Sequence, residues 1–114
     1  MKKPDQSKLN YVSGLSRLAE MFIENADYKN AEKMAEQIAK CDYPVLSSEI
    51  FIKTGNMKRA RDILVPHAEE LCKTGRHISA ARCYKDVGML QEYLIELKEH
   101  KLDFEIKFGG KKSS

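Results

Sequence analysis

KTGNMKRA, residues 53–60, is the stretch that decides the fold of this chain. It follows an apolar segment, contains a glycine suited to the left-handed end of a helix, and leads into another apolar segment. Two further stretches are similar tight turns between apolar segments: DVGMLQEY (86–93), which also has a glycine, and ENADYKNA (24–31), where Asn25 and Asp27 form a polar turn. The three begin 29 and 33 residues apart, which is a period typical of stacked helix-turn-helix repeats. The sequence therefore predicts successive helical hairpins.

Apolar residues recur at intervals of three and four along six segments, which predicts six helices. In chain order we expect them at about 7–24, 28–41, 44–54, 57–73, 77–87 and 90–100. Asp27 and Asp42 are the expected caps of the second and third helices, and Pro44 suits a first helical turn. Pro66 lies inside a stripe that stays in phase across it, so we expect a kink there and not a break.

The same spacing assigns residues to buried positions. Those expected to face inward include Leu9, Leu18, Met21, Tyr28, Ile78, Leu90, Leu94 and Leu97. Gly14 lies inside the first helix, where we expect it to permit close packing.

The fold class that follows is all-α, a right-handed stack of about three helical hairpins. A closed six-helix bundle would use the same periodicity and the same short loops, and it remains an alternative. Residues 9–100 form the helical-repeat domain in this prediction. Residues 1–8 are a flexible N-terminus, and residues 101–114 are a C-terminal cap or tail that is flexible at its end.

Composition limits the cellular context. At 114 residues the chain is long enough for one domain, and its 20 basic and 17 acidic residues give a net charge of only +3. Cys41, Cys72 and Cys83 are odd in number and form no CxxC pair, as is usual for reduced cytoplasmic proteins. No apolar run approaches the roughly 20 residues of a membrane span. We expect a cytoplasmic protein with no signal peptide and no membrane insertion.

The segment LDFEIKF, residues 102–108, alternates apolar and charged side chains, which is the period of a strand. A lone strand would have to pair with another chain. The other interpretation, which we favour, is a helical or extended tail that folds Phe104 and Phe108 over the last hairpin.

Residues that could carry chemistry do not converge. His67, His77 and His100 lie on different predicted helices, and only Cys72 with His77 approaches the spacing of a metal-ligand pair. Carboxylate pairs such as Glu96 with Glu99 have the spacing of a solvated helix face, and no phosphate-binding loop is present. We expect surface histidines, core cysteines, no metal, no cofactor and no enzymatic activity.

Basic residues gather in the middle of the chain, where segment 53–85 has eight of them against four acidic residues. If they share one edge, they could bind an acidic peptide or, less readily, RNA. Nucleic acid is the weaker option because aromatic residues are not interleaved with the basic ones. The candidate protein-binding residues are Lys58, Arg59, Arg61, Arg76 and Arg82, together with Phe104 and Phe108 of the tail.

Segments 18–38, 47–64 and 79–97 resemble tetratricopeptide-like helical repeats. Phe51 to Met57 and Tyr84 to Met89 share an aromatic residue, a glycine and an apolar residue before the next helix, and in this they resemble the degenerate α-solenoids of intraflagellar transport and of clathrin-type and coatomer-type coat proteins. The resemblance implies a non-enzymatic scaffold that binds other subunits of a larger transport or coat complex, in the cytoplasm or the cilium. The alternative from the residues is a small helical adaptor that binds acidic peptide or RNA through the basic middle.

Overall fold

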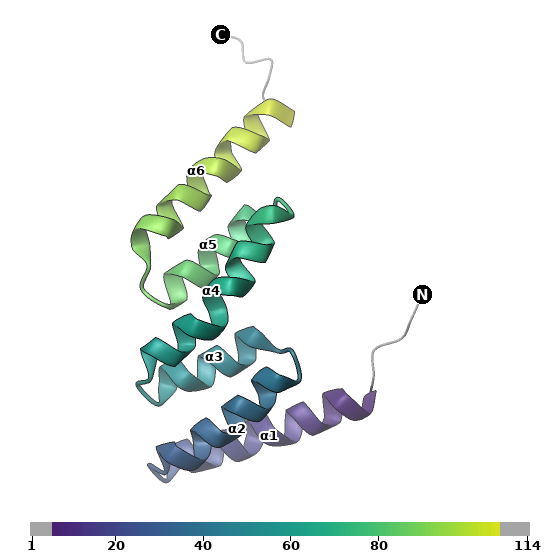
Figure 1. Ribbon diagram of the computed structural model, residues 1–114, viewed down its shortest axis with the longest axis vertical. Coiled ribbons are helices and arrows are strands. Elements are labelled where there is room, and N and C mark those ends of the chain that lie inside the picture. Colours follow the sequence, from purple (N-terminus) through teal and green to yellow (C-terminus); the bar gives the residue numbers. More distant parts are fainter. Residues whose placement is uncertain (1–5, 108–114) are drawn as a thin grey trace. The chain divides into compact units, whose positions relative to one another are not determined.

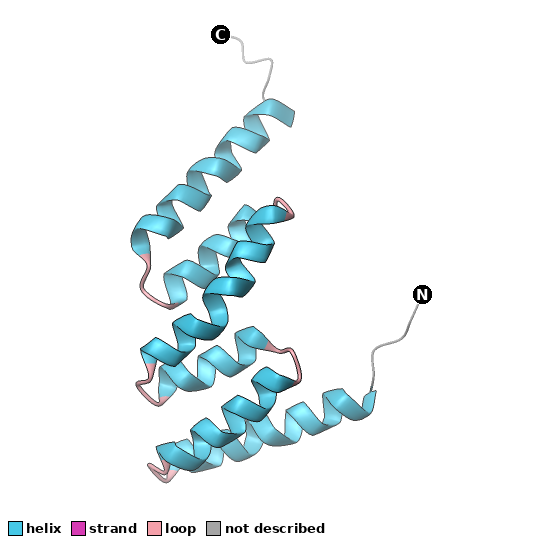
Figure 2. Cartoon of the chain, viewed as in Figure 1, coloured by secondary structure: helices cyan, strands magenta, loops and turns pink. Residues whose placement is uncertain are grey.

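The computed structural model describes residues 6–107, with side chains described as far as Leu102. Its six helices, joined by short turns, are α1 (Gln6–Glu24), α2 (Tyr28–Lys40), α3 (Pro44–Lys53), α4 (Met57–Lys73), α5 (His77–Asp86) and α6 (Leu90–Lys107) (Figure 1). No strand occurs between residues 6 and 107 (Figure 2). The all-α class and the six predicted helices are confirmed, and only the end of α6 differs by more than one residue from the prediction.

The chain divides into two compact units, one ending at Ile63 and the other beginning at Leu64, inside α4. In the first unit, α2 packs against both α1 and α3, and α1 also contacts α3. Its buried core contains Ala31, Ala35 and Ile38 of α2 together with Ile50 and Phe51 of α3. Alanines on α2 let neighbouring helices approach closely, so the larger side chains of α3 fill the remaining space.

A buried hydrogen bond connects α2 and α3. The hydroxyl of Ser47 donates to the carbonyl oxygen of Ala35 at 2.8 Å, and both residues have zero exposed surface. Since a buried hydroxyl without a partner is costly, this bond satisfies Ser47 and favours one axial position of α3 along α2.

The turns largely follow the predicted chemistry. Asp27 caps α2, accepting from the backbone N–H of Asn30 at 3.3 Å. Gly55 and Gly75 adopt φ of 85° and 78°, the left-handed conformation that closes a helix. The prediction for α3 is wrong in part: its N-cap is Tyr43, which makes no side-chain capping bond, although Pro44 does open the helix. Asp42 has φ of 67° and belongs instead to the turn that follows α2.

In the second unit, α5 packs against α6, and the buried residues of α5 are Ala80, Ala81, Cys83 and Tyr84. Leu64 and Ala68 of α4 are buried as well. Pro66 lies inside α4 and does not end it, which confirms that the helix continues across this proline.

The strand alternative is wrong as far as the structure describes this segment, because residues 102–107 continue α6, as the favoured interpretation of a helical tail allows. No glycine or proline interrupts the chain between Leu90 and Lys107, and extending an existing helix is easier than starting a new element. Phe104 therefore lies on the last part of α6, beyond the described side chains, and Phe108 lies outside the described residues.

Several expected inward positions are also wrong. The structure exposes Leu9, Leu18, Met21, Tyr28, Ile78, Leu90 and Leu94. The apolar stripes of α1 and α6 are wider than the faces that α2 and α5 cover, so part of each stripe remains in solvent. None of the helices between residues 6 and 107 is both long enough and apolar enough to cross a bilayer.

Candidate functional site

Exposed apolar surface is concentrated on two helices. Of eleven large apolar side chains that are exposed among residues 6–102, eight lie on α1 and α6. On α1 they are Leu9, Tyr11, Leu18 and Met21, and on α6 they are Leu90, Leu94, Ile95 and Leu102. Exposed apolar side chains that gather on one face mark protein-binding sites more often than apolar residues scattered singly do.

The outer face of α1 consists of Tyr11, Gly14, Leu18 and Met21. Their spacing of three, four and three residues places them in one row along the helix. Tyr11, Leu18 and Met21 have 52%, 45% and 56% of their surface exposed. The close packing expected at Gly14 is absent among the described residues, because a Cβ added there would meet no atom within 4 Å. Glycine inside a helix costs about 1 kcal/mol relative to alanine, and no contact within the described structure explains it.

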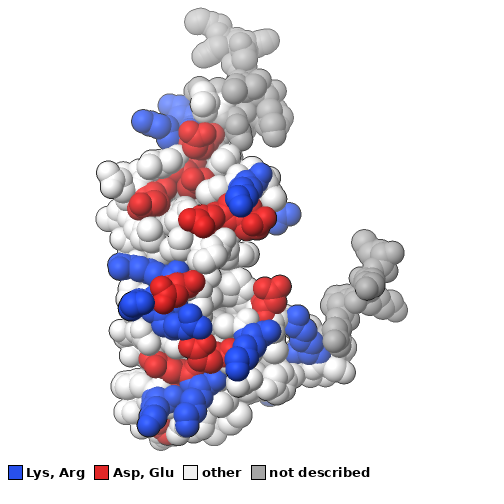
Figure 3. Space-filling model, in the orientation of Figure 1, with Lys and Arg blue, Asp and Glu red and all other residues white. Residues whose placement is uncertain are grey.

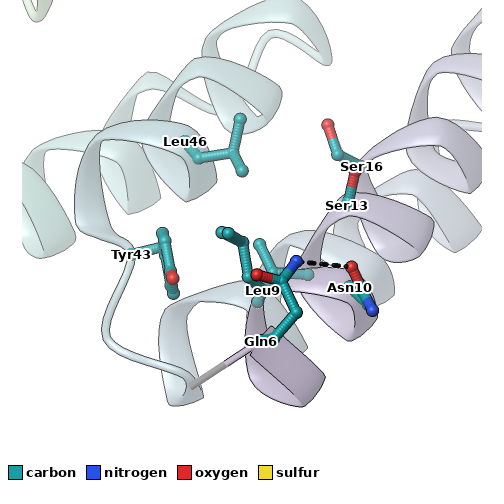
Figure 4. Close-up of a pocket in the computed structure, with 8 residues that line it drawn as sticks. Gln6, Leu9, Asn10, Ser13, Ser16, Tyr43 and Leu46 are labelled. Carbon is teal, nitrogen blue, oxygen red and sulfur yellow. Dashed lines mark hydrogen bonds between the residues drawn. The ribbon is translucent and has the colours of Figure 1, made fainter. Parts of the chain in front are cut away.

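A shallow pocket of about 390 Å³ lies between the first half of α1 and the start of α3 (Figure 4). Leu9, Val12 and Leu46 supply apolar lining, while Gln6 and Asn10 form a hydrogen bond of 3.1 Å at its edge. The other lining residues are Ser13, Ser16 and Tyr43. Among the described residues that line it there is no carboxylate, histidine, lysine or cysteine, so the pocket suits an apolar side chain of a partner better than catalysis.

The five basic candidate residues are divided between the two units. Lys58, Arg59 and Arg61 lie near the start of α4 in the first unit, whereas Arg76 precedes α5 and Arg82 lies on it in the second. Lys58 and Arg59 have acidic partners, Asp62 at 3.3 Å and Glu36 at 2.7 Å respectively. Figure 3 likewise shows acidic side chains among the basic ones in each unit. The local excess of basic residues is thus partly neutralised by acidic neighbours.

Arg59 makes the shorter of these two ion pairs, through two hydrogen bonds. Its Nε and one terminal nitrogen each donate to a carboxylate oxygen of Glu36 at 2.7 Å, and the guanidinium lies 5.9 Å from the ring centre of Phe51. The hydrogen bond from Arg59 lowers the pKa of Glu36 below its ordinary value of 4.5. Arg59 therefore holds the start of α4 against α2 and α3, which is a structural role.

Replacing Glu36 with glutamine should lower the free energy of unfolding by about 0.5–1 kcal/mol at neutral pH, because the bidentate pair is partly solvated. The pKa of Glu36 is depressed in the folded protein, so its contribution is complete above pH 4.5 and is lost as the pH falls toward the lowered pKa. The difference between wild type and Glu36→Gln, measured by urea unfolding from pH 7 to pH 3, should shrink at acidic pH. Asp62→Asn is the control, and its exposed i,i+4 pair should contribute less than about 0.5 kcal/mol. A difference that stays constant down to pH 3 would contradict this role of Glu36.

A polar cluster connects helices of the second unit. His77 Nδ1 lies 2.8 Å from Glu96 Oε1, and their side chains are only 13% and 12% exposed. The expectations of a surface histidine and a solvated Glu96 are therefore wrong at these two positions. The pair joins the start of α5 to the middle of α6, where the packing of the two helices has brought residues 19 positions apart into contact.

Cys72 and Tyr84 belong to the same cluster. Burial and, to a smaller extent, a hydrogen bond to Glu96 together raise the pKa of the Cys72 thiol to about 11. Burial likewise raises the pKa of Tyr84 to about 12. Burial also raises the pKa of Cys83. A thiol with a raised pKa is protonated at neutral pH and is a poor nucleophile. Cys72 and Cys83 therefore have the properties of structural cysteines and not of reactive ones.

No group of three or more histidine, cysteine, aspartate or glutamate side chains among the described residues is arranged to hold a metal ion. Cys72 and His77, the pair closest to ligand spacing, are both engaged with Glu96. Comparison with models of known protein families, with curated proteins and with solved structures gave no match.

Sequence reasoning missed the pairing of His77 with Glu96 and misjudged the outer faces of α1 and α6. The histidine signal was weak because 19 residues separate the partners. The signal for the outer faces was present, since α1 has more apolar positions than a single buried stripe requires.

Proposed function

We propose that this chain is a non-enzymatic scaffold of stacked helical hairpins that binds other protein subunits. The observation that carries the proposal is the concentration of exposed apolar side chains on α1 and α6, the first and last helices. In a stack of helical repeats each unit covers its neighbour, so a helix face that stays apolar and exposed can be covered by a further repeat or by another subunit.

Gly14 supports the same proposal. It lies in a row with Tyr11, Leu18 and Met21, and the space around its Cα is open. A missing side chain between large apolar ones lets the backbone of a second helix approach closely. A helix of a partner protein packed along this row would account for a glycine that weakens α1 by itself.

The resemblance to degenerate α-solenoids supports a more specific version. In that version the chain is a subunit, or a segment of one, in an intracellular transport or coat complex. Three similar turns at a period near 30 residues are the sequence features behind it. The charge neutralisation around Lys58 and Arg59 gives no additional support to binding through the basic middle.

Affinity purification of the tagged chain from cells, with chemical cross-linking and mass spectrometry, tests the proposal. We expect stoichiometric protein partners that persist at moderate salt and cross-link to residues near α1 or α6. In the double variant Leu18→Glu/Met21→Glu, recovery of the partner that cross-links near α1 should fall by about tenfold, because two carboxylates would be desolvated in the contact.

Lys33→Glu is the matched control, because it changes the net charge by the same two units at an exposed position of α2. It should leave recovery unchanged. Recovery of RNA alone, with strongly salt-dependent binding, would contradict the proposal and favour the basic adaptor. A turnover activity without any stable protein partner would contradict it as well.

A further inference from the structure

The last helix, α6, has two faces of different chemistry. Its inner face carries the Glu96 carboxylate that pairs with His77, and Tyr93 and Leu97 are half-buried beside it. At about 100° per residue, Ile95 and Leu102 fall on the opposite side, with Leu94 next to them, and Leu90 lies at the edge of this side near Leu97. Between 52% and 61% of the surface of each of these four side chains is exposed. We call this set, together with Lys98 and Lys101, the outer face of α6.

The two lysines lie among the apolar side chains and not at a distant edge. Lys98 and Lys101 are one turn apart, and with Glu99 and Leu102 they line a hollow of about 290 Å³. Neither lysine forms an ion pair with any other residue in the described part of the chain. Glu99 lies beside the lysines and lines the same hollow. Glu92 lies about 20° from Glu99 around the helix, at the edge of this face, and Glu96 lies toward the inner side, where it pairs with His77.

A partner that covers Leu94 and Leu102 must place its own groups beside the ammonium groups of Lys98 and Lys101. Carboxylates at those positions would pair with the lysines, whereas cationic groups would be repelled. A second copy bound through the same face would bring four lysines together, so the charges disfavour self-association of α6.

We infer that the outer face of α6 binds an acidic amphipathic helix of another protein. The apolar stripe of that helix covers Leu90, Leu94 and Leu102, and its aspartate or glutamate side chains pair with Lys98 and Lys101. Helix-on-helix docking of this kind uses apolar anchors about one helical turn apart. On α6, Leu90 and Leu94 are four residues apart, Leu102 follows two turns further on, and Lys98 and Lys101 lie between them. The inference deepens the proposed function and rests on it, because it assigns one surface of the scaffold and the chemistry of its partner.

The test uses the full chain and a fluorescent synthetic helix of about 20 residues, with leucines on one stripe and glutamates on both flanks. A second peptide has lysine in place of every glutamate. We expect the wild-type protein to bind the glutamate peptide with a measurable Kd by fluorescence anisotropy and to bind the lysine peptide at least about tenfold more weakly.

Charge reversal provides the decisive comparison. The variant Lys98→Glu/Lys101→Glu should lose about tenfold in affinity for the glutamate peptide and should prefer the lysine peptide. The variant Leu94→Gln/Leu102→Gln should bind both peptides more weakly than the wild type does. Lys29→Glu/Lys33→Glu, the same change of charge on exposed positions of α2, should leave both affinities unchanged. Circular dichroism of each variant checks that the helices are intact.

Three results would overturn the inference: no binding of the glutamate peptide, equal binding of both peptides, or a charge reversal without effect. Binding to vesicles of anionic lipid that is tighter than peptide binding and lost in Lys98→Glu/Lys101→Glu would also overturn it, in favour of a membrane surface. If the glutamate peptide does not bind but the affinity purification still recovers protein partners that cross-link to the chain, only this inference is wrong and the proposed function stands.

Discussion

Phe51→Ala should destabilise the first unit by about 3–5 kcal/mol, the range usual for removing a buried aromatic side chain. Phe51 is 1% exposed on α3, and α2 packs against the same helix with Ile38 and its alanines. Small neighbours cannot expand to fill the cavity, so relaxation should recover little of the loss. The free energy of unfolding of a natural domain is about 5–15 kcal/mol in total. The variant should therefore be close to unfolding at ambient temperature.

Urea unfolding and hydrogen exchange of the α2 and α3 amides would measure this effect. Tyr11→Ala is the matched control, because it removes an aromatic side chain that is 52% exposed on α1, and the free energy should change by less than about 0.5 kcal/mol. A loss below about 1 kcal/mol in Phe51→Ala would mean that Phe51 does not anchor the core of the first unit.

Ala35→Leu should be the second large effect, with a loss of about 1–3 kcal/mol from overpacking. Ala35 has no exposed surface, and its carbonyl oxygen accepts the hydroxyl of Ser47 at 2.8 Å. A leucine side chain would push α3 away from α2, and that displacement would also lengthen the Ser47 hydrogen bond.

Lys33→Leu provides the comparison for Ala35→Leu, since it introduces the same side chain at an exposed position of the same helix. The free energy of unfolding of Lys33→Leu should be almost the same as that of the wild type. Protection of the α3 amides from hydrogen exchange should fall in Ala35→Leu alone. If both variants have wild-type stability, α2 and α3 do not depend on close approach at Ala35.

The helices of this chain were predictable because their turns use strong local signals. Gly55 and Gly75 adopt the left-handed conformation that glycine allows, and Asp27 caps α2 as its side chain suggests. Local signals failed at Asp42, where the residue adopts a positive φ in the turn and leaves the cap to Tyr43. The alternation of apolar and charged residues in segment 102–108 was also misleading. It has the period of a strand, but α6 continues through residues 102–107.

Burial was less predictable than helix position, for a physical reason. Periodicity shows which residues of a helix share a face, but a face is buried only if another element covers it. Leu90 and Leu94 fit the apolar stripe of α6 and are nevertheless 61% exposed. The pairing of His77 with Glu96 escaped prediction for a related reason, because it depends on how two helices meet and not on the spacing within either one.

The two thiols of the second unit, half-buried Cys72 and buried Cys83, have a practical consequence. Because burial raises the pKa of both Cys72 and Cys83, alkylating reagents should react with them slowly while the helices stay closed. Cys41, which is half-buried in the first unit, provides an internal reference in the same molecule. The rate of thiol alkylation thus measures opening of α4, α5 and α6 without an engineered probe. A ligand that binds α6 and holds it in place should lower that rate.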